Sequence, residues 1–228
     1  MPVRSLRPAL PRPWLPVLPV LLVVALSPSV GCGSRDAAPG PVVMDEKQHE
    51  AWEIALVEMR IDKNEEFADA ARTPLPADRL PAFEGLNYYF PKPELRFRTK
   101  LAPGGGAGTV TLTKRKGEQV PYVRKGTVSF THEGKAHKLT VFGPADTTHG
   151  DYLWLPFYDA TTGKETYGGG RYLDLKVDAD GMVEVDFNYA YNPLCDYNPD
   201  AYNCTLPPKE NTLPFAVEAG EKLFAGPH

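Results

Sequence analysis

Hydrophobic and polar positions repeat with different periods in successive parts of this chain. Residues 46–61 place Trp52, Leu56 and Met59 on one face at helical spacing. From about Leu95 onward, apolar and polar residues alternate, and turn residues recur every eight to twelve positions or so. The pattern predicts one N-terminal amphipathic helix followed by a β-rich region.

The ends of the helical region are marked by residues of the expected types. Asp45 stands where an N-cap is needed. We expect a second short helix around residues 64–71, stopped by Pro74 and Pro76. The predicted fold class is therefore α+β: mainly antiparallel β-structure, as a small barrel or a sandwich, with one or two N-terminal helices packed on it.

The register of one hairpin follows directly from its turn. Glu133 and Gly134 separate two alternating segments, and a two-residue turn at this dipeptide is typical of antiparallel hairpins. With that turn, Val128 faces Leu139. The prediction places both side chains on the apolar face of the sheet.

A second hairpin requires a loop with an odd number of residues. Apolar residues must face each other across the turn, and a three-residue loop ending at Gly181 in the left-handed conformation pairs Val177 with Val183. The same register places Asp174 opposite Asp186. Facing carboxylates repel unless a cation or a shared proton lies between them. The pair is either a site for a cation or a polar substrate, or a solvated sheet face without consequence.

Arg171 has the parity of the inward-facing residues Leu173 and Leu175. A guanidinium that points toward the core needs an anionic partner. We predict Asp159 as that partner, with Tyr167 as an additional hydrogen-bond partner. The group is either a structural salt bridge or part of a binding site.

The N-terminal region has the features of an exported protein. A basic stretch without acids leads into an apolar run over residues 15–26, which is too short and too often interrupted by proline to span a bilayer. The run ends in a Ser-Val-Gly-Cys tetrapeptide that looks like a bacterial lipobox, in which Cys32 receives acyl chains such as palmitate. An ordinary secretory signal with an incidental Cys32 is the alternative.

The lipobox divides the chain into three parts. We predict a lipoprotein signal peptide over 1–31, a flexible tether over 32–44 that is rich in Gly, Ala and Pro, and a single β-rich domain with its N-terminal helix over 45–228. The membrane is then a partner through the lipid anchor. Gly33 rather than Asp follows the cysteine, so the predicted location is the bacterial cell envelope, at the outer membrane, facing the periplasm or the cell surface.

Export of the chain also determines what we expect of the two cysteines that remain besides Cys32. In an oxidising compartment, Cys195 and Cys204 are expected to form a disulfide. Zinc is a weaker alternative because no His stands nearby at ligand spacing, and we expect neither a metal nor another cofactor.

The formal charge of −4 becomes more negative without the arginines of the leader, so a nucleic-acid partner is not expected. The sequence does not specify the oligomeric state.

Several motifs in the C-terminal half carry a family resemblance. They are the stretch 186–195 (DFNYAYNPLC) followed by Tyr197, Cys204, Pro207, Pro208, Glu210 and Asn211, the stretch 159–163 (DATTG) with Tyr167 and 170–172, and the stretch 219–221. Together they resemble the bacterial domain-of-unknown-function 1684 family over roughly residues 52–222. Asp196 stands where that family usually has Ala, and Thr205 where Pro is usual. The resemblance implies a lipoprotein domain but no established activity.

Residues 188–211 form a long polar segment rich in Tyr, Asn and Pro. Such side chains offer flat apolar area with hydrogen-bonding tips, as sugar- and peptide-binding surfaces do. We predict a ligand-binding module for a small molecule or carbohydrate, with a polar pocket near this segment; a structural cap over the sheet is the alternative. The candidate binding or catalytic residues are Asp159, Tyr167, Arg171, Asp174, Asp186, Asn188, Tyr191 and Asn192.

The sequence favours binding over catalysis. No nucleophile elbow, zinc-protease motif or phosphate-binding loop is present. Two other functions remain open. One is a hydrolase that uses Asp174 and Asp186 as paired carboxylates, one of them with a raised pKa. The other is a purely structural envelope protein.

Overall fold

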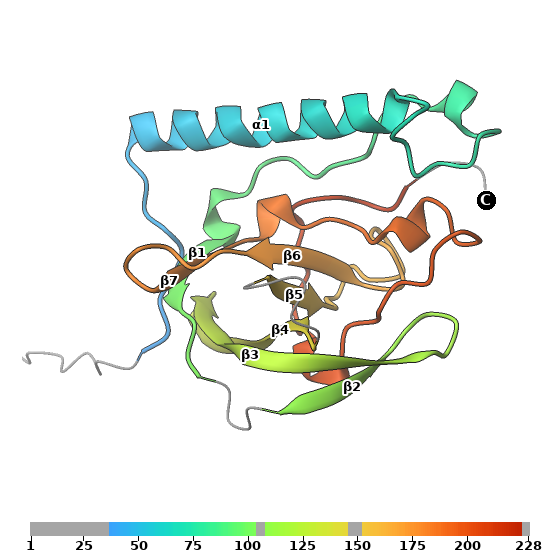
Figure 1. The fold of residues 1–228 in the computed structure, drawn as a ribbon. Coiled ribbons are helices and arrows are strands. Elements are labelled where there is room, and N and C mark those ends of the chain that lie inside the picture. Colours follow the sequence, from blue (N-terminus) through green and yellow to red (C-terminus); the bar gives the residue numbers. More distant parts are fainter. Residues whose placement is uncertain (1–36, 104–107, 146–151, 225–228) are drawn as a thin grey trace, which may run out of the picture. The chain divides into compact units, whose positions relative to one another are not determined.

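The structure is a computed structural model that describes residues 37–103, 108–145 and 152–224. The predicted signal peptide and Cys32 lie outside these ranges. A single long helix, α1 (Glu46–Ala68), lies along one side of a set of antiparallel strands (Figure 1). Among the described residues, no helix combines the length and the apolar character needed to cross a membrane.

The described strands form two antiparallel sheets. The large sheet has the order β2-β3-β4-β5-β6, and the small sheet pairs β1 with β7. The bounds are β1 Arg96–Lys100, β2 Thr109–Thr113, β3 Gln119–His132, β4 Lys135–Pro144, β5 Leu153–Phe157, β6 Arg171–Leu175 and β7 Met182–Asp186. Isolated bridges connect the sheets at Val177–Val183 and Ala102–Thr127, but the ladder does not close into a barrel. The fold is therefore a sandwich-like α+β structure.

Short 3-10 helices connect these elements. They are η1 Leu80–Ala82, η2 Pro93–Leu95, η3 Phe187–Tyr189, η4 Leu194–Asp196 and η5 Lys209–Asn211. The last three belong to the long segment after β7, in which the sequence pattern shows little regular structure. This segment crosses the outer face of the large sheet and returns toward α1 (Figure 1).

Helix α1 begins with the predicted cap. The Asp45 carboxylate accepts a hydrogen bond from the Gln48 backbone at 2.8 Å, and the Gln48 side chain accepts one from the Asp45 backbone at 3.0 Å, which together form a capping box. The prediction of two separate helices was wrong. Residues 62–67 contain neither Gly nor Pro, and Phe67 continues the buried stripe of Trp52 and Leu56, so one helix runs through to Ala68.

The first predicted hairpin is present in the predicted register. Val128 faces Leu139 across β3 and β4. Glu133 and Gly134 have φ values of 49° and 74°, so both turn residues occupy the left-handed region that a type I′ hairpin turn requires. Local turn chemistry was sufficient to determine this register.

The second predicted hairpin is correct only next to its loop. Val177 pairs with Val183, and Gly181 has a φ of 74°. The Asp178 carboxylate accepts hydrogen bonds from the backbones of Asp180 and Met182, each at 2.9 Å. The chain therefore reverses as predicted.

Beyond the loop the two strands separate into different sheets. Asp174 lies opposite Trp154 of β5, and Asp186 lies opposite Arg96 of β1. The predicted pairing of the two carboxylates was therefore wrong. The prediction assumed that β6 and β7, which are adjacent in sequence, stay paired. Instead, β6 pairs with the strand before it, β5, and β7 pairs with the distant strand β1, so the two strands help to enclose the core between the sheets.

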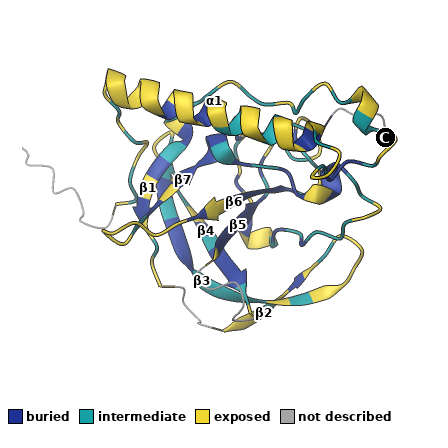
Figure 2. Cartoon of the chain, turned by 45° about the horizontal axis from the view of Figure 1, so that its top comes forward, coloured by how far each residue is buried: buried dark blue, intermediate teal, exposed yellow. Residues whose placement is uncertain are grey.

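The main core lies between the two sheets. Phe97, Phe130, Phe157 and Phe187 are fully buried there, and their rings meet in tilted and edge-on contacts. Figure 2 shows this contrast: the strands are mostly buried, whereas the outward side of α1 is exposed. A further aromatic cluster covers the opposite, outer face of the large sheet.

Part of the predicted flexible tether is attached to the domain. Thr131 of β3 donates to the carbonyl oxygens of Ala38 and Pro39 at 2.7 Å each. The Val42 backbone donates to the Arg96 carbonyl at 2.8 Å. These hydrogen bonds attach residues 38–42 to β1 and β3.

Candidate functional site

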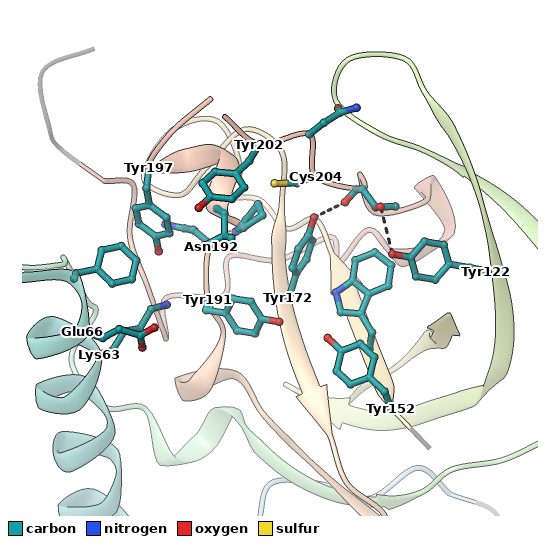
Figure 3. A pocket seen from close by; sticks show the side chains of 16 residues that line it. Lys63, Glu66, Tyr122, Tyr152, Tyr172, Tyr191, Asn192, Tyr197, Tyr202 and Cys204 are labelled. Carbon is teal, nitrogen blue, oxygen red and sulfur yellow. Dashed lines mark hydrogen bonds between the residues drawn. The ribbon is translucent and has the colours of Figure 1, made fainter. Parts of the chain in front are cut away.

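A cavity of about 490 Å³ opens between α1, the outer face of the large sheet and the segment after β7 (Figure 3). Eight aromatic side chains contribute to its wall: Phe67, Tyr122, Tyr152, Trp154, Tyr172, Tyr191, Tyr197 and Tyr202. Polar side chains, including Lys63, Glu66 and Asn192, complete the lining. We refer to this space as the aromatic cavity.

Strand alternation places the floor of the aromatic cavity on the outer face of the sheet. Trp154 of β5 and Tyr172 of β6 point away from the core, because their neighbours along each strand point into it. The Trp154 ring lies 4.9 Å from that of Tyr172 in an edge-on contact and 5.0 Å from that of Tyr122 of β3. Three strands therefore supply one continuous aromatic floor.

The loop over residues 195–204, which we call the disulfide loop, forms another wall. The predicted disulfide between Cys195 and Cys204 is present, with a Cα–Cα distance of 6.0 Å. Just before the loop, Tyr191 forms two backbone hydrogen bonds with Tyr172, at 2.9 and 3.0 Å. Just after it, the Thr205 carbonyl accepts a hydrogen bond from the Tyr172 hydroxyl (Figure 3). Both ends of the wall are thus attached to β6.

Asp174 lies at the rim of the aromatic cavity. The hydroxyls of Tyr152 and Tyr191 donate to the same Asp174 oxygen, Oδ1, at 2.7 and 2.8 Å. Burial, together with the carboxylate, raises the pKa of both tyrosines. Both phenols therefore stay protonated and keep donating. The Asp174 side chain is exposed, and its second oxygen, Oδ2, accepts no hydrogen bond from a described residue.

Glu221 connects α1 to the wall of the aromatic cavity. Its carboxylate is only 2% exposed and forms an ion pair with Lys63. It also accepts hydrogen bonds from the Tyr197 hydroxyl, from the Tyr88 hydroxyl at 3.4 Å and from the Asn192 backbone at 2.8 Å. This arrangement fixes the Lys63 ammonium at the helix side of the cavity.

Arg171 meets its predicted partner in the interior rather than in the cavity. Its guanidinium lies 3.5 Å from the Asp159 carboxylate and donates to the carbonyls of Val217, Ala219 and Glu221. Arg171 is 1% exposed. These contacts hold the closing segment of the chain against β6, and neither Arg171 nor Asp159 lines the aromatic cavity.

Tyr167 does not join this group. Within the described ranges, its hydroxyl forms no hydrogen bond with Asp159 or Arg171. Its ring lies against Gly169 and lines a separate cavity of about 380 Å³ with Arg115 and Asp196. The predicted extra hydrogen bond was wrong because the Tyr167 side chain turns away from the core.

Asp186 and Asn188 fasten other elements together. Asp186 accepts hydrogen bonds from the Trp52 indole of α1 at 2.7 Å and from the Asn188 side chain at 2.8 Å. Asn188 makes two further hydrogen bonds to the backbone of Lys92, at 2.7 and 2.8 Å. Burial raises the pKa of Asp186. Both residues lie outside the aromatic cavity.

Asn192 joins the cavity wall to a buried carboxyl group. Its amide donates to Asp196 at 2.8 Å and to the Lys222 carbonyl at 2.7 Å. Asp196 is 2% exposed, and burial raises its pKa to about 7. Among the described residues, Oδ1 of Asn192 and Oδ1 of Asp196 both lack a hydrogen-bond partner.

Of the predicted candidates, Tyr191 and Asn192 line the aromatic cavity and Asp174 lies at its rim. Sequence reasoning missed Lys63, Glu66, Tyr122, Tyr152, Trp154, Tyr172, Tyr197 and Tyr202. One signal was available: residues 153–157 form an uninterrupted apolar run, all buried, and such a strand is covered on both faces. In the described part of the chain, no group of three or more His, Cys, Asp or Glu side chains is placed to hold a metal ion.

Comparisons with known proteins establish the family. The family model described as protein of unknown function (DUF1684) matches residues 81–222, so the chain belongs to this family, as its motifs predicted. A solution NMR structure of an uncharacterized protein from Haloarcula marismortui is similar to this chain, with 36% sequence identity and a TM-score of 0.59 over 78% of this chain and 97% of that one. No curated protein matches.

Proposed function

We propose that this protein is a lipid-anchored envelope protein whose domain binds a small, carbohydrate-like ligand in the aromatic cavity. The observation that carries the proposal is that eight aromatic side chains and several polar groups line one cavity of about 490 Å³. This volume lies in the range of small-molecule sites, which bury apolar ligand surface and orient the ligand through a few polar contacts.

The chemistry of the walls suits a ligand with both apolar and hydroxyl-bearing surfaces. A sugar ring presents C–H groups on its faces, which pack on aromatic rings, and hydroxyls at its edge. Neither Asp174 Oδ2 nor the Tyr202 hydroxyl forms a hydrogen bond with a described residue, so both can bind such hydroxyls. The disulfide loop holds this wall in place without a ligand, so little ordering entropy is lost on binding.

A binding role is favoured over hydrolysis by paired carboxylates. Asp174 and Asp186 belong to different sheets and have separate partners. The two carboxylates that the hydrolase hypothesis requires therefore do not face each other. A structural envelope protein without a small ligand is the remaining rival, and the ligand-binding test below separates it from a binding module.

The ligand-binding test uses a wall residue that can be removed without disturbing the core. Tyr202 is half-buried and lines the cavity, so Tyr202→Ala should weaken ligand binding roughly tenfold. Phe90→Ala is the matched control, because Phe90 is 88% exposed and lies away from the cavity. Titration calorimetry against neutral, basic and acidic cell-envelope oligosaccharides provides the readout. If no sugar binds the parent protein, the carbohydrate proposal fails and the structural rival gains support.

The anchor is tested separately from the cavity. Lipid attachment at Cys32 would place the protein in the membrane fraction, and two or three acyl chains hold a soluble domain durably. We expect Cys32→Ser to move the protein to the soluble fraction, with the Cys195–Cys204 disulfide intact. Intact-mass measurement of the native protein should show a diacylglycerol adduct. An unmodified Cys32 in a fully processed chain would contradict the lipoprotein assignment.

A further inference from the structure

We propose that the natural ligand of the aromatic cavity is a cation, bound through an ammonium group. This inference rests on the proposed function, because it specifies the chemical class of ligand for the same cavity. It concerns the charge of the ligand, which the carbohydrate proposal leaves open. Amino sugars and other small amines carry the required group.

The fixed charges around the cavity favour a positive ligand. Lys63 is neutralised by its ion pair with Glu221. The carboxylates of Glu66, in the lining, and Asp174, at the rim, form no ion pair within the described ranges. Among the described residues, these two carboxylates thus have no ion-pair partner, and their field attracts cations and repels anions.

Basic residues near the disulfide loop do not change this balance. Arg115 and Lys116 donate to the carbonyls of Pro199 and Asp200. Neither basic side chain lines the aromatic cavity. Their positive charge is therefore directed toward the backbone of the loop rather than toward a bound ligand.

The rings of the cavity already hold one cation. The Lys63 ammonium lies 5.3 Å from the centre of the Tyr191 ring, 5.6 Å from that of Phe67 and 5.8 Å from that of Tyr197. Electron-rich ring faces attract positive charge at these distances. The protein thus uses the helix side of the cavity as a partial aromatic cage for its own side chain.

The far side of the cavity is also lined by aromatic rings. Tyr122, Tyr152 and Trp154 line it, and no Lys or Arg of the described residues stacks over these rings. Aromatic cages of this composition bind ammonium groups in general. The open position beside these rings is where the geometry places the ligand cation.

Asp174 strengthens this position in two ways. Tyr152 and Tyr191 donate to its Oδ1, and their hydroxyl groups point toward one another in Figure 3. A phenol that donates to a carboxylate becomes more electron-rich, which strengthens its attraction for a cation. Oδ2 of Asp174 accepts no hydrogen bond from a described residue, so it can receive an N–H of the ligand.

The experiment compares ligands of one shape and different charge. Three trisaccharides with the same linkage, composed of glucosamine, N-acetylglucosamine or glucuronate, are titrated into the full-length protein by calorimetry. Choline and its uncharged isostere 3,3-dimethylbutanol form a second pair. We expect each cationic probe to bind roughly tenfold more tightly than its neutral counterpart, with the anionic trisaccharide weakest.

Paired substitutions identify the source of any preference. The double variant Glu66→Gln with Asp174→Asn keeps the shape of the cavity and removes its charge, and should remove most of the roughly tenfold preference while leaving the neutral probes unchanged. The control is Glu65→Gln with Asp180→Asn, two acids outside the cavity. Circular dichroism verifies that both variants fold.

The outcomes separate this inference from the proposed function. If the N-acetylglucosamine trisaccharide binds as tightly as the glucosamine trisaccharide, the proposal of a cationic ligand is wrong, whereas the proposal of a carbohydrate site is still supported. Binding of choline alone supports the cation and removes the carbohydrate assignment. A preference that survives in the double variant overturns the assigned role of Glu66 and Asp174. Failure of every probe to bind overturns both proposals.

Discussion

The two faces of strand β6 carry charged side chains in very different settings. On the core face, Arg171 is enclosed by Asp159 and by backbone carbonyls of the closing segment. On the outer face, three residues further along, Asp174 is exposed and binds two tyrosines through one oxygen. A charge enclosed by its partners holds the fold together, whereas a carboxylate beside a cavity, with one oxygen unpartnered among the described residues, can bind a ligand.

The largest expected change in stability comes from a substitution on the core face of β6. Arg171→Met leaves Asp159 buried without its cation and leaves several carbonyls without donors, so the free energy of unfolding should fall by about 3 to 5 kcal/mol. Urea denaturation at neutral pH measures this decrease in the free energy of unfolding. Arg98→Met is the control, because Arg98 pairs with Asp178 at the exposed surface, where the change should be far smaller. Equal stability of Arg171→Met and the parent would contradict the structural role of Arg171.

An intermediate change in stability is expected from Asp196, which is buried like Asp159 but forms no ion pair with a described residue. The folded state raises its pKa to about 7, so between about pH 4 and pH 7 the folded protein binds a proton that the unfolded chain releases. Stability should therefore decrease as the pH rises through this window, by about 2 to 4 kcal/mol in total.

Asp196→Asn is the matched variant for this pH dependence. The amide cannot ionise, so the variant should lose most of the decrease and become more stable than the parent at pH 8. Denaturation curves recorded between pH 4 and pH 8 show the effect. Asp186, whose pKa is also raised, contributes in the same direction in both proteins. Parallel pH profiles for parent and variant would show that Asp196 is ionised in the folded state.

The smallest effect on stability is expected on the outer face. Asp174→Asn should change the free energy of unfolding by less than about 0.5 kcal/mol, because the side chain is exposed. Its chemical effect should still be measurable. Asp174 helps to raise the pKa of Tyr152 and Tyr191, so these phenols should ionise at lower pH in the variant. Ultraviolet titration at alkaline pH detects this shift, and an unchanged titration would exclude the hydrogen bonds to Asp174.

Features controlled by neighbouring residues could be predicted from the sequence. The cap at Asp45, the turn at Glu133–Gly134 and the inward direction of Arg171 depend on a few adjacent positions. The Cys195–Cys204 disulfide followed from the inferred export of the chain. For the cap, the turn and the arginine, the identities of the neighbouring residues leave one main possibility.

Features that depend on distant segments could not be predicted in this way. Asp174 and Asp186 were assigned to one site because their strands are adjacent in sequence, but β6 pairs with β5 and β7 pairs with β1. The aromatic cavity was missed for the same reason. Its rings come from α1, from three strands and from the segment after β7, and no single stretch of sequence shows that they converge.

The attachment of residues 38–42 to β1 and β3 limits how far the domain can travel from its proposed anchor. With a lipid on Cys32, residues 33–37 would separate the anchor from this attached segment, and that many residues span at most about 20 Å. The domain would therefore stay within one molecular diameter of the bilayer. A ligand would therefore have to diffuse to the protein within this thin layer next to the lipid headgroups.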